Sequence, residues 1–232
     1  MEVWGSYALA DFLLFSPQAY FRQFALINET AVPLPVLLHG LAAALLWLSG
    51  SSIPWRRRAV LIGLAVLWAS SAWLFHWRSY AAINWVAPWF AAGFALQSGI
   101  LLWRGAATDI DRERRSSAGI SLTKGVALAC VILYPLQAAL FERPWREAEL
   151  IGVSPDATAL FTAAMVVLLA PQWRWLLLVA PTVWLAVGLL TLGTMGAPEV
   201  WTLSALFLVL VAALIADRKD RGAGRSSPAP ED

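Results

Sequence analysis

The chain has 232 residues, of which 59% are hydrophobic and 14% are charged, and its mean hydropathy is +0.65. Soluble domains carry about 45–50% apolar and about 25% charged residues, so a single soluble core could not bury this much apolar surface. High hydropathy excludes intrinsic disorder of the whole chain. A net charge of +2, with no basic face, excludes a nucleic-acid binder. The composition predicts an all-α membrane protein.

The first 30 residues form an amphipathic segment. Charged side chains such as Asp11, Arg22 and Glu29 are scattered among aromatic ones, which is typical of a helix in the membrane interface. Ser16 followed by Pro17 predicts the N-cap and first residue of this helix. We expect residues 1–30 to lie on the outer side of the membrane.

Seven apolar runs follow between residues 31 and 216, most of them close to the length of about 20 residues that crosses a bilayer. They are residues 32–50, 59–77, 81–103, 121–141, 156–171, 174–193 and 198–216. The runs predict a single domain of about seven transmembrane helices. The charged residues 217–232, rich in Gly, Pro and Ser, predict a disordered cytoplasmic tail.

The basic residues distinguish the two sides of this domain. Four of the 17 lie in segments on one side, namely Arg22, Arg78, Arg143 and Arg146, and the other 13 lie on the opposite side. Because Lys and Arg are enriched in cytoplasmic segments, the N-terminus is expected outside and the C-terminus inside. Nine tryptophans near the predicted span ends indicate aromatic belts: Trp47, Trp55, Trp77, Trp85, Trp103, Trp145, Trp173, Trp175 and Trp201.

Polar side chains within the predicted spans are costly and therefore mark candidate sites. His76 follows a stripe of alanines at helical spacing, so we expect it to face the bundle rather than lipid. Asn84 begins a similar stripe of small residues on the next predicted span. Both residues lie at the outer end of their spans, with Arg78 between them, which predicts an outward-facing site.

The predicted outer loop 142–156 is dense in charge and contributes further candidates. Arg143 or Arg146 could bind an anionic group above a pocket, or pair locally with neighbouring carboxylates in a solvated loop. The predicted ligand-binding residues are His76, Arg78, Asn84, Arg143, Trp145, Glu149 and Asp156.

A transition metal such as zinc is a second hypothesis for the outer face. His39, His76 and Asp11 offer nitrogen and oxygen ligands, although no HxxxH, HExxH or CxxC spacing is present. Cys130 is the single cysteine and falls in an apolar run, which predicts a small buried hydrophobe.

Several short motifs resemble an uncharacterised family of bacterial multi-spanning membrane proteins. They are Asp11-Phe-Leu-Leu-Phe-Ser-Pro17, Phe75-His-Trp77, Ile83-Asn-Trp85, Arg143-Pro-Trp145, Pro155-Asp156 and Thr194-Met-Gly-Ala-Pro-Glu199. The family pattern has a glycine before Arg-Pro-Trp, where this chain has Glu142. Its members form a domain-of-unknown-function family and are sometimes labelled permeases, so the resemblance implies membrane topology and transport without naming a solute.

The favoured hypothesis is a multi-pass protein of the bacterial inner membrane that acts as a permease or binding protein for a small polar or anionic solute. One alternative is an intramembrane enzyme, metal-dependent in one version, that acts on a lipid or isoprenoid at the outer leaflet. Another is a structural or assembly protein. The expected partners are the lipid bilayer and a small-molecule ligand, without nucleic acid.

Overall fold

The computed structural model describes residues 15–50, 53–107, 117–169 and 173–225, and these ranges are mostly helical. The α-helices are α1 (Pro17–Thr30), α2 (Leu34–Leu48), α3 (Pro54–Ser71), α4 (Ala87–Ala106), α5 (Ser117–Leu140), α6 (Pro155–Leu169), α7 (Arg174–Thr194) and α8 (Glu199–Arg225). Shorter elements are the π-helix η3 (Ala72–Ser79) and the 3₁₀ turns η4 (Tyr80–Ala82) and η5 (Trp145–Glu147). The described ranges contain no β-strand, which confirms the all-α prediction.

Within the described ranges, four segments are long and apolar enough to cross a membrane. They are Pro54–Ala82, Gly119–Leu140, Arg174–Thr194 and Glu199–Ala216. A fifth span results if α1 and α2, bent by 97° at their junction, count as one broken span. All nine tryptophans predicted for the aromatic belts are exposed, as expected for rings that face lipid headgroups. The chain is therefore a helical membrane protein with four to five clearly apolar spans.

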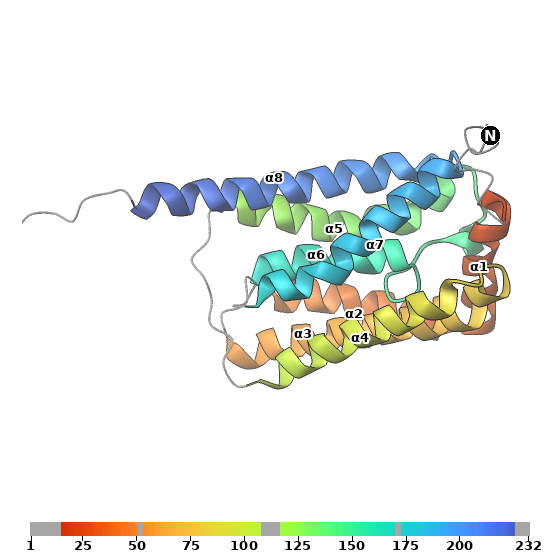
Figure 1. Ribbon diagram of the computed structural model, residues 1–232, viewed down its shortest axis with the longest axis horizontal. Helices are drawn as coiled ribbons and strands as arrows, with labels where there is room; N and C mark the ends of the chain where they lie inside the picture. The colour runs from red at the N-terminus through yellow and green to blue at the C-terminus, as the bar shows by residue number, and fades with distance from the viewer. Residues whose placement is uncertain (1–14, 51–52, 108–116, 170–172, 226–232) are drawn as a thin grey trace, which may run out of the picture.

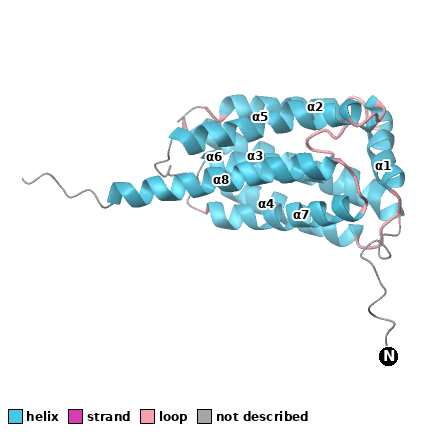
Figure 2. Cartoon of the chain, turned by 90° about the horizontal axis from the view of Figure 1, so that it is seen from above, coloured by secondary structure: helices cyan, strands magenta, loops and turns pink. Residues whose placement is uncertain are grey.

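Helices α2 to α8 run broadly along one direction, while α1 lies across one end of the bundle (Figures 1 and 2). Ser16 begins α1 as predicted, because its Oγ accepts a hydrogen bond from the N–H of Ala19 (3.2 Å). Phe24 packs inward against Phe75 of η3, with ring centroids 4.9 Å apart. Aromatic packing thus fixes α1 across the bundle, at what we call the α1 end.

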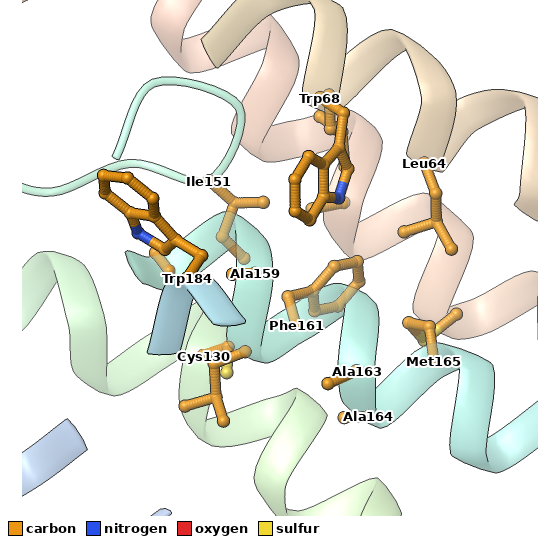
Figure 3. Packing of buried hydrophobic residues seen from close by; sticks show 14 of the residues in the cluster. Leu64, Trp68, Cys130, Ile151, Ala159, Phe161, Ala163, Ala164, Met165 and Trp184 are labelled. Carbon is orange, nitrogen blue, oxygen red and sulfur yellow. The ribbon is translucent and has the colours of Figure 1, made fainter. Parts of the chain in front are cut away.

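Helix α6 is the centre of the bundle, and every one of its residues is buried. It contacts α3, α5, α7 and α8, and Figure 3 shows Phe161 of α6 in the core with Trp68 of α3 and Cys130 of α5. Trp68 donates its indole N–H to Thr162 Oγ1 (2.8 Å). The predicted burial of Cys130 is confirmed, since its side chain is fully enclosed.

Two predicted element boundaries are wrong. The span predicted to begin at residue 81 begins at Ala87, because α3 continues through η3 and η4 and the chain then turns before α4. The last helix continues to Arg225, so the boundary predicted at residue 217 for a disordered tail falls within α8. Charged residues do not stop a helix that has left the apolar layer.

Candidate functional site

The segment that joins α5 to α6 folds back into the α1 end of the bundle (Figure 1). Just after α5, Glu142 has φ 56°, a left-handed conformation that favours glycine. The N–H of Arg143 donates to the carbonyl of Ala138 (2.6 Å), which closes the helix end as in a Schellman motif. A glycine at position 142 would adopt this conformation without strain.

This segment is fastened to α1 and α2. Asn28 Nδ2 donates to the carbonyls of Arg146 and Ala148, at 2.9 Å each. His39 Nδ1 accepts from the N–H of Ile151 (3.1 Å), and its Nε2 lies 2.9 Å from the carbonyl of Val131. Both ring nitrogens of His39 are therefore engaged by backbone, and its observed contacts hold the loop in place.

The second half of the segment is deeply buried. Gly152 has φ 89°, and a Cβ there would lie 2.9 Å from Cβ of Leu38, so only glycine fits beneath α2. Its N–H donates to Thr158 Oγ1 (2.8 Å), and Ser71 Oγ donates to the carbonyl of Val153 (3.1 Å). Irregular backbone at this depth is tolerated because protein groups satisfy it.

One guanidinium, that of Arg143, is shared among several carboxylates at the α1 end. Its Nη2 lies 3.0 Å from Oε2 of Glu149, and its Nε lies 2.8 Å from Oε1 of Glu199. Its Nη1 lies 4.0 Å from Oε2 of Glu147, and its Cζ lies 3.8 Å from the centre of the Phe21 ring. We call Arg143, Glu147, Glu149 and Glu199 the acidic cluster.

The acidic cluster carries more negative than positive charge when its carboxylates are ionised. Burial raises the pKa of Glu149 to about 8, because the cost of desolvating its charge outweighs the attraction of Arg143. The nearby carboxylates of Asp156 and Glu199 raise this pKa further. Near neutral pH, Glu149 therefore holds a proton that it releases when the surroundings gain positive charge.

A pocket of about 360 Å³ opens beside the acidic cluster. It is lined by Pro17, Gln18, Phe21, Phe141, Glu142, Arg143, Pro144, Glu147, Gly196, Ala197, Pro198 and Glu199, and we call it the α1-end pocket. Glu199 is 3% exposed; its Oε1 pairs with Arg143 Nε, whereas its Oε2 accepts no hydrogen bond from the described residues. The pocket therefore presents a buried carboxylate with free acceptor capacity.

A second polar group lies deeper, at the start of α6. Asp156 is 1% exposed, and its Oδ1 accepts the indole N–H of Trp184 (2.8 Å). A Cβ at Gly188 would lie 2.4 Å from this Oδ1, so the glycine makes room for the carboxyl group. On another side of Trp184 lies His76, with ring centroids 4.8 Å apart.

The structure brings some of the predicted ligand-binding residues together and separates others. Arg143, Glu149 and Asp156 converge at the α1 end, since all three interact electrostatically around Glu149. The prediction that His76 faces the bundle is confirmed, as it is fully buried. Trp145 is 60% exposed and does not line the α1-end pocket.

Arg78 and Asn84 lie apart from this group. Arg78 lines a separate pocket of about 190 Å³ between α1 and η3. Asn84 precedes α4 instead of lying on it, and its Oδ1 accepts the N–H of Val86 (3.0 Å). The prediction that Asn84 begins a helical stripe is wrong, because its side chain forms a local turn before the helix.

The residues predicted as metal ligands that the structure describes, His39 and His76, do not form a metal-binding cluster. Within the described ranges, no three His, Cys, Asp or Glu side chains are placed to hold a metal ion. Asp11 lies outside the described residues. His39 bonds to backbone groups, whereas His76 lies among aromatic rings.

Three residues of the site were missing from the predicted set. Glu199 closes a motif quoted for the family resemblance, and a carboxylate that begins an apolar run was a usable signal. Phe21 and Gly188 gave no such signal, because an interfacial aromatic and a glycine in an apolar helix are common.

These features define a helical membrane protein with a buried acidic site at one end of its bundle. The chain belongs to the family of unknown function DUF6064, which it matches over residues 17–225. The predicted relation to an uncharacterised family is thereby confirmed. No curated protein and no solved structure gives a significant match.

Proposed function

We propose that the chain is a permease or binding protein of a bacterial inner membrane, and that its α1-end pocket faces outward and takes a small polar solute carrying a cationic group. Seven helices, α2 to α8, would span the membrane, and α1 would lie in the outer interface. The distribution of basic residues along the sequence supports this orientation, because 13 of the 17 fall in segments that the sequence predicts on the cytoplasmic side.

The charge of the site favours a cationic over an anionic solute. The sequence hypothesis gave Arg143 the role of holding an anion, but Glu149 and Glu199 already lie 3.0 and 2.8 Å from its guanidinium. An anion would have to displace a carboxylate and would then be repelled by it. The single observation that carries the proposal is Glu199, buried at the pocket wall with an Oε2 that accepts no hydrogen bond from the described residues. Ammonium or guanidinium N–H groups satisfy such oxygens.

The ring of Phe21 adds to this preference. It already stacks on one guanidinium, with Arg143 Cζ 3.8 Å from the ring centre, and it lines the same pocket as Glu199. Aromatic faces attract cations through their quadrupole, and combinations of rings with carboxylates recognise organic ammonium groups. The pocket is thus suited to a compact organic cation.

Broken backbone beside the site supports transport over static binding. Transporter sites are commonly built where helices are discontinuous near the membrane centre. Here the buried segment before α6 leads into a helix of only 15 residues, and α3 changes to a π-helix over Ala72–Ser79. π-Helical segments occur frequently at functional sites.

Binding should be measured by calorimetry on the full chain in nanodiscs, with methylammonium, methylguanidinium and tetramethylammonium as cations and acetate and inorganic phosphate as anions. We expect a cation to bind and Glu199→Gln to weaken it about tenfold, the equivalent of about 1.4 kcal/mol. Glu29→Gln is the matched control, because Glu29 is an exposed carboxylate at the same end, 3.7 Å from Arg146, and it should not change binding.

Two results would overturn the proposal. One is binding of phosphate or acetate that Arg143→Gln abolishes, which would restore the anionic hypothesis. The other is equal cation binding by the Glu199→Gln and Glu29→Gln proteins. Uptake of labelled methylammonium into proteoliposomes then separates a permease from a binding protein, since only a permease accumulates solute inside the vesicle.

A further inference from the structure

Two polar side chains in the bundle interior have hydrogen-bonding atoms without a partner among the described residues. Asp156 Oδ2 accepts nothing, although the residue is 1% exposed, and both ring nitrogens of fully buried His76 are also without a partner. Such atoms usually cost about 1–3 kcal/mol each when unsatisfied. Both side chains contact Trp184, so the two groups belong to one interior site.

Among the residues that the structure describes, no basic group is found to shift the titration of the Asp156 carboxyl group. The groups that face Asp156 electrostatically are Tyr20 of α1, Tyr80 of η4, Tyr134 of α5 and Glu149 of the loop. His76 is surrounded by the rings of Phe75, Tyr80, Phe90, Phe94 and Trp184. The nearest basic side chain recorded in this network is Arg143, which lies beyond Glu149 and already pairs with it.

The space around Asp156 suits a proton better than a larger ion. The helix α7 passes so close that a Cβ at Gly188 would lie 2.4 Å from Oδ1 and 3.4 Å from Oδ2. The indole N–H of Trp184 donates to Oδ1 and so leaves no room for an ion on that side of the carboxyl group. A bare carboxylate in such apolar packing is costly, and binding one proton removes the charge without needing room.

We propose that Asp156 is a proton-binding site in the bundle interior, with His76 as a second acceptor beside Trp184, and that the proton is exchanged for the cation bound in the α1-end pocket. The coupling rests on the proposed function, whereas the proton site itself does not. When a cation arrives beside Glu199, its charge stabilises the ionised forms of Glu149 and Asp156. The O–H bond of the Asp156 carboxyl group then breaks, its electron pair stays on the carboxylate, and the proton passes to solvent in the α1-end pocket.

The first measurement is the infrared spectrum of the full chain in nanodiscs near neutral pH. A protonated buried carboxyl group gives a C=O stretching band, and we expect this band in the wild-type minus Asp156→Asn difference spectrum. Asparagine retains the Oδ1 that accepts from Trp184, so the variant isolates protonation from packing. Glu149→Gln is measured beside it, because Glu149 contributes a band of its own. The absence of a band that depends on Asp156 between pH 5 and 9 would overturn the proton site.

The second measurement is proton release in weakly buffered solution when methylammonium is added. We expect the wild type to release protons when the cation binds, and Asp156→Asn to release about one proton fewer for each cation bound, with cation binding retained. Equal release by the two proteins would overturn the exchange. His76→Gln should reduce the release, with cation binding retained. Cation binding without proton release overturns the exchange and leaves the proposed function intact. If no cation binds, the proposed function fails and the infrared band alone decides the proton site.

Discussion

Gly188 is required by the carboxyl group of Asp156, which occupies the space where a side chain would begin. A Cβ at position 188 would lie 2.4 Å from Oδ1 and 3.0 Å from Cγ of Asp156. Substitution Gly188→Ala therefore forces the carboxyl group to move. The contact that it loses is the 2.8 Å hydrogen bond from the indole N–H of Trp184.

The expected size of the effect follows from two opposing contributions. Leaving the buried indole N–H of Trp184 without its acceptor costs about 1–3 kcal/mol, whereas Ala is favoured over Gly within a helix by about 1 kcal/mol. Gly188→Ala should therefore lower the free energy of unfolding by up to about 2 kcal/mol. Gly193 on the same helix is the matched control, since its Cβ would meet nothing nearer than Val200 Cγ2 at 4.0 Å. Gly193→Ala should raise stability by up to about 1 kcal/mol.

The assay uses the single cysteine as a reporter. Cys130 is fully buried, so a thiol-reactive fluorogenic dye reacts only when the bundle opens on heating. For a chain of this size, 1 kcal/mol corresponds to about 2–4 °C in Tm, so Gly188→Ala should melt up to about 8 °C below the wild type. The steric argument would be refuted if the Gly188→Ala protein melted at or above the temperature of the Gly193→Ala protein.

Three further predictions concern stability measured by the melting temperature of the full chain in nanodiscs. Burial raises the pKa of Glu149 from 4.5 to about 8, so the native state keeps a proton that the unfolded chain has lost. Wild-type stability should therefore fall as the pH rises from about 4.5 to 8, by up to about 1.4 kcal/mol per unit. Glu149→Gln should flatten this dependence of stability on pH. An unchanged slope would show that other titrating groups cause it. Glu142→Gly should stabilise by about 1 kcal/mol, because φ 56° strains a residue with a Cβ, and a destabilised variant would contradict this. Trp68→Phe should cost about 2 kcal/mol through its lost hydrogen bond to Thr162, whereas an unchanged melting temperature would show that the bond contributes little.

Helical class and helix positions followed from the sequence because apolar length is a strong one-dimensional signal. Each of the seven predicted apolar runs overlaps one of the helices α2 to α8. The Ser16-Pro17 pair also predicted the start of α1, since capping needs only a local oxygen. The failures occurred where local geometry overrides composition. Residues 81–86 are apolar enough to extend a span, yet the π-helix before them leads into a turn.

The candidate site was predicted in part because buried polar residues are rare in such a chain. His76 was identified from this rarity, and Arg143, Glu149 and Asp156 were identified from the dense charge of the predicted outer loop 142–156. The structure buries His76, Glu149 and Asp156 and pairs Arg143 with Glu149. The sign of the charge that the site favours in a solute was not predictable. It depends on Glu199, which is 56 residues from Arg143 in sequence and reaches it only through the packing of α8.

The 15 residues of α6 make a helix about 22 Å long at 1.5 Å per residue, shorter than the hydrocarbon layer of about 30 Å. Its N-terminus continues into backbone that is stable only when surrounded by protein. Such a segment has no stable place in lipid by itself during synthesis. In the folded chain α6 packs against α5, which precedes it, and against α7 and α8, which follow it. The site that α6 begins therefore depends on helices from both sides of it in the sequence.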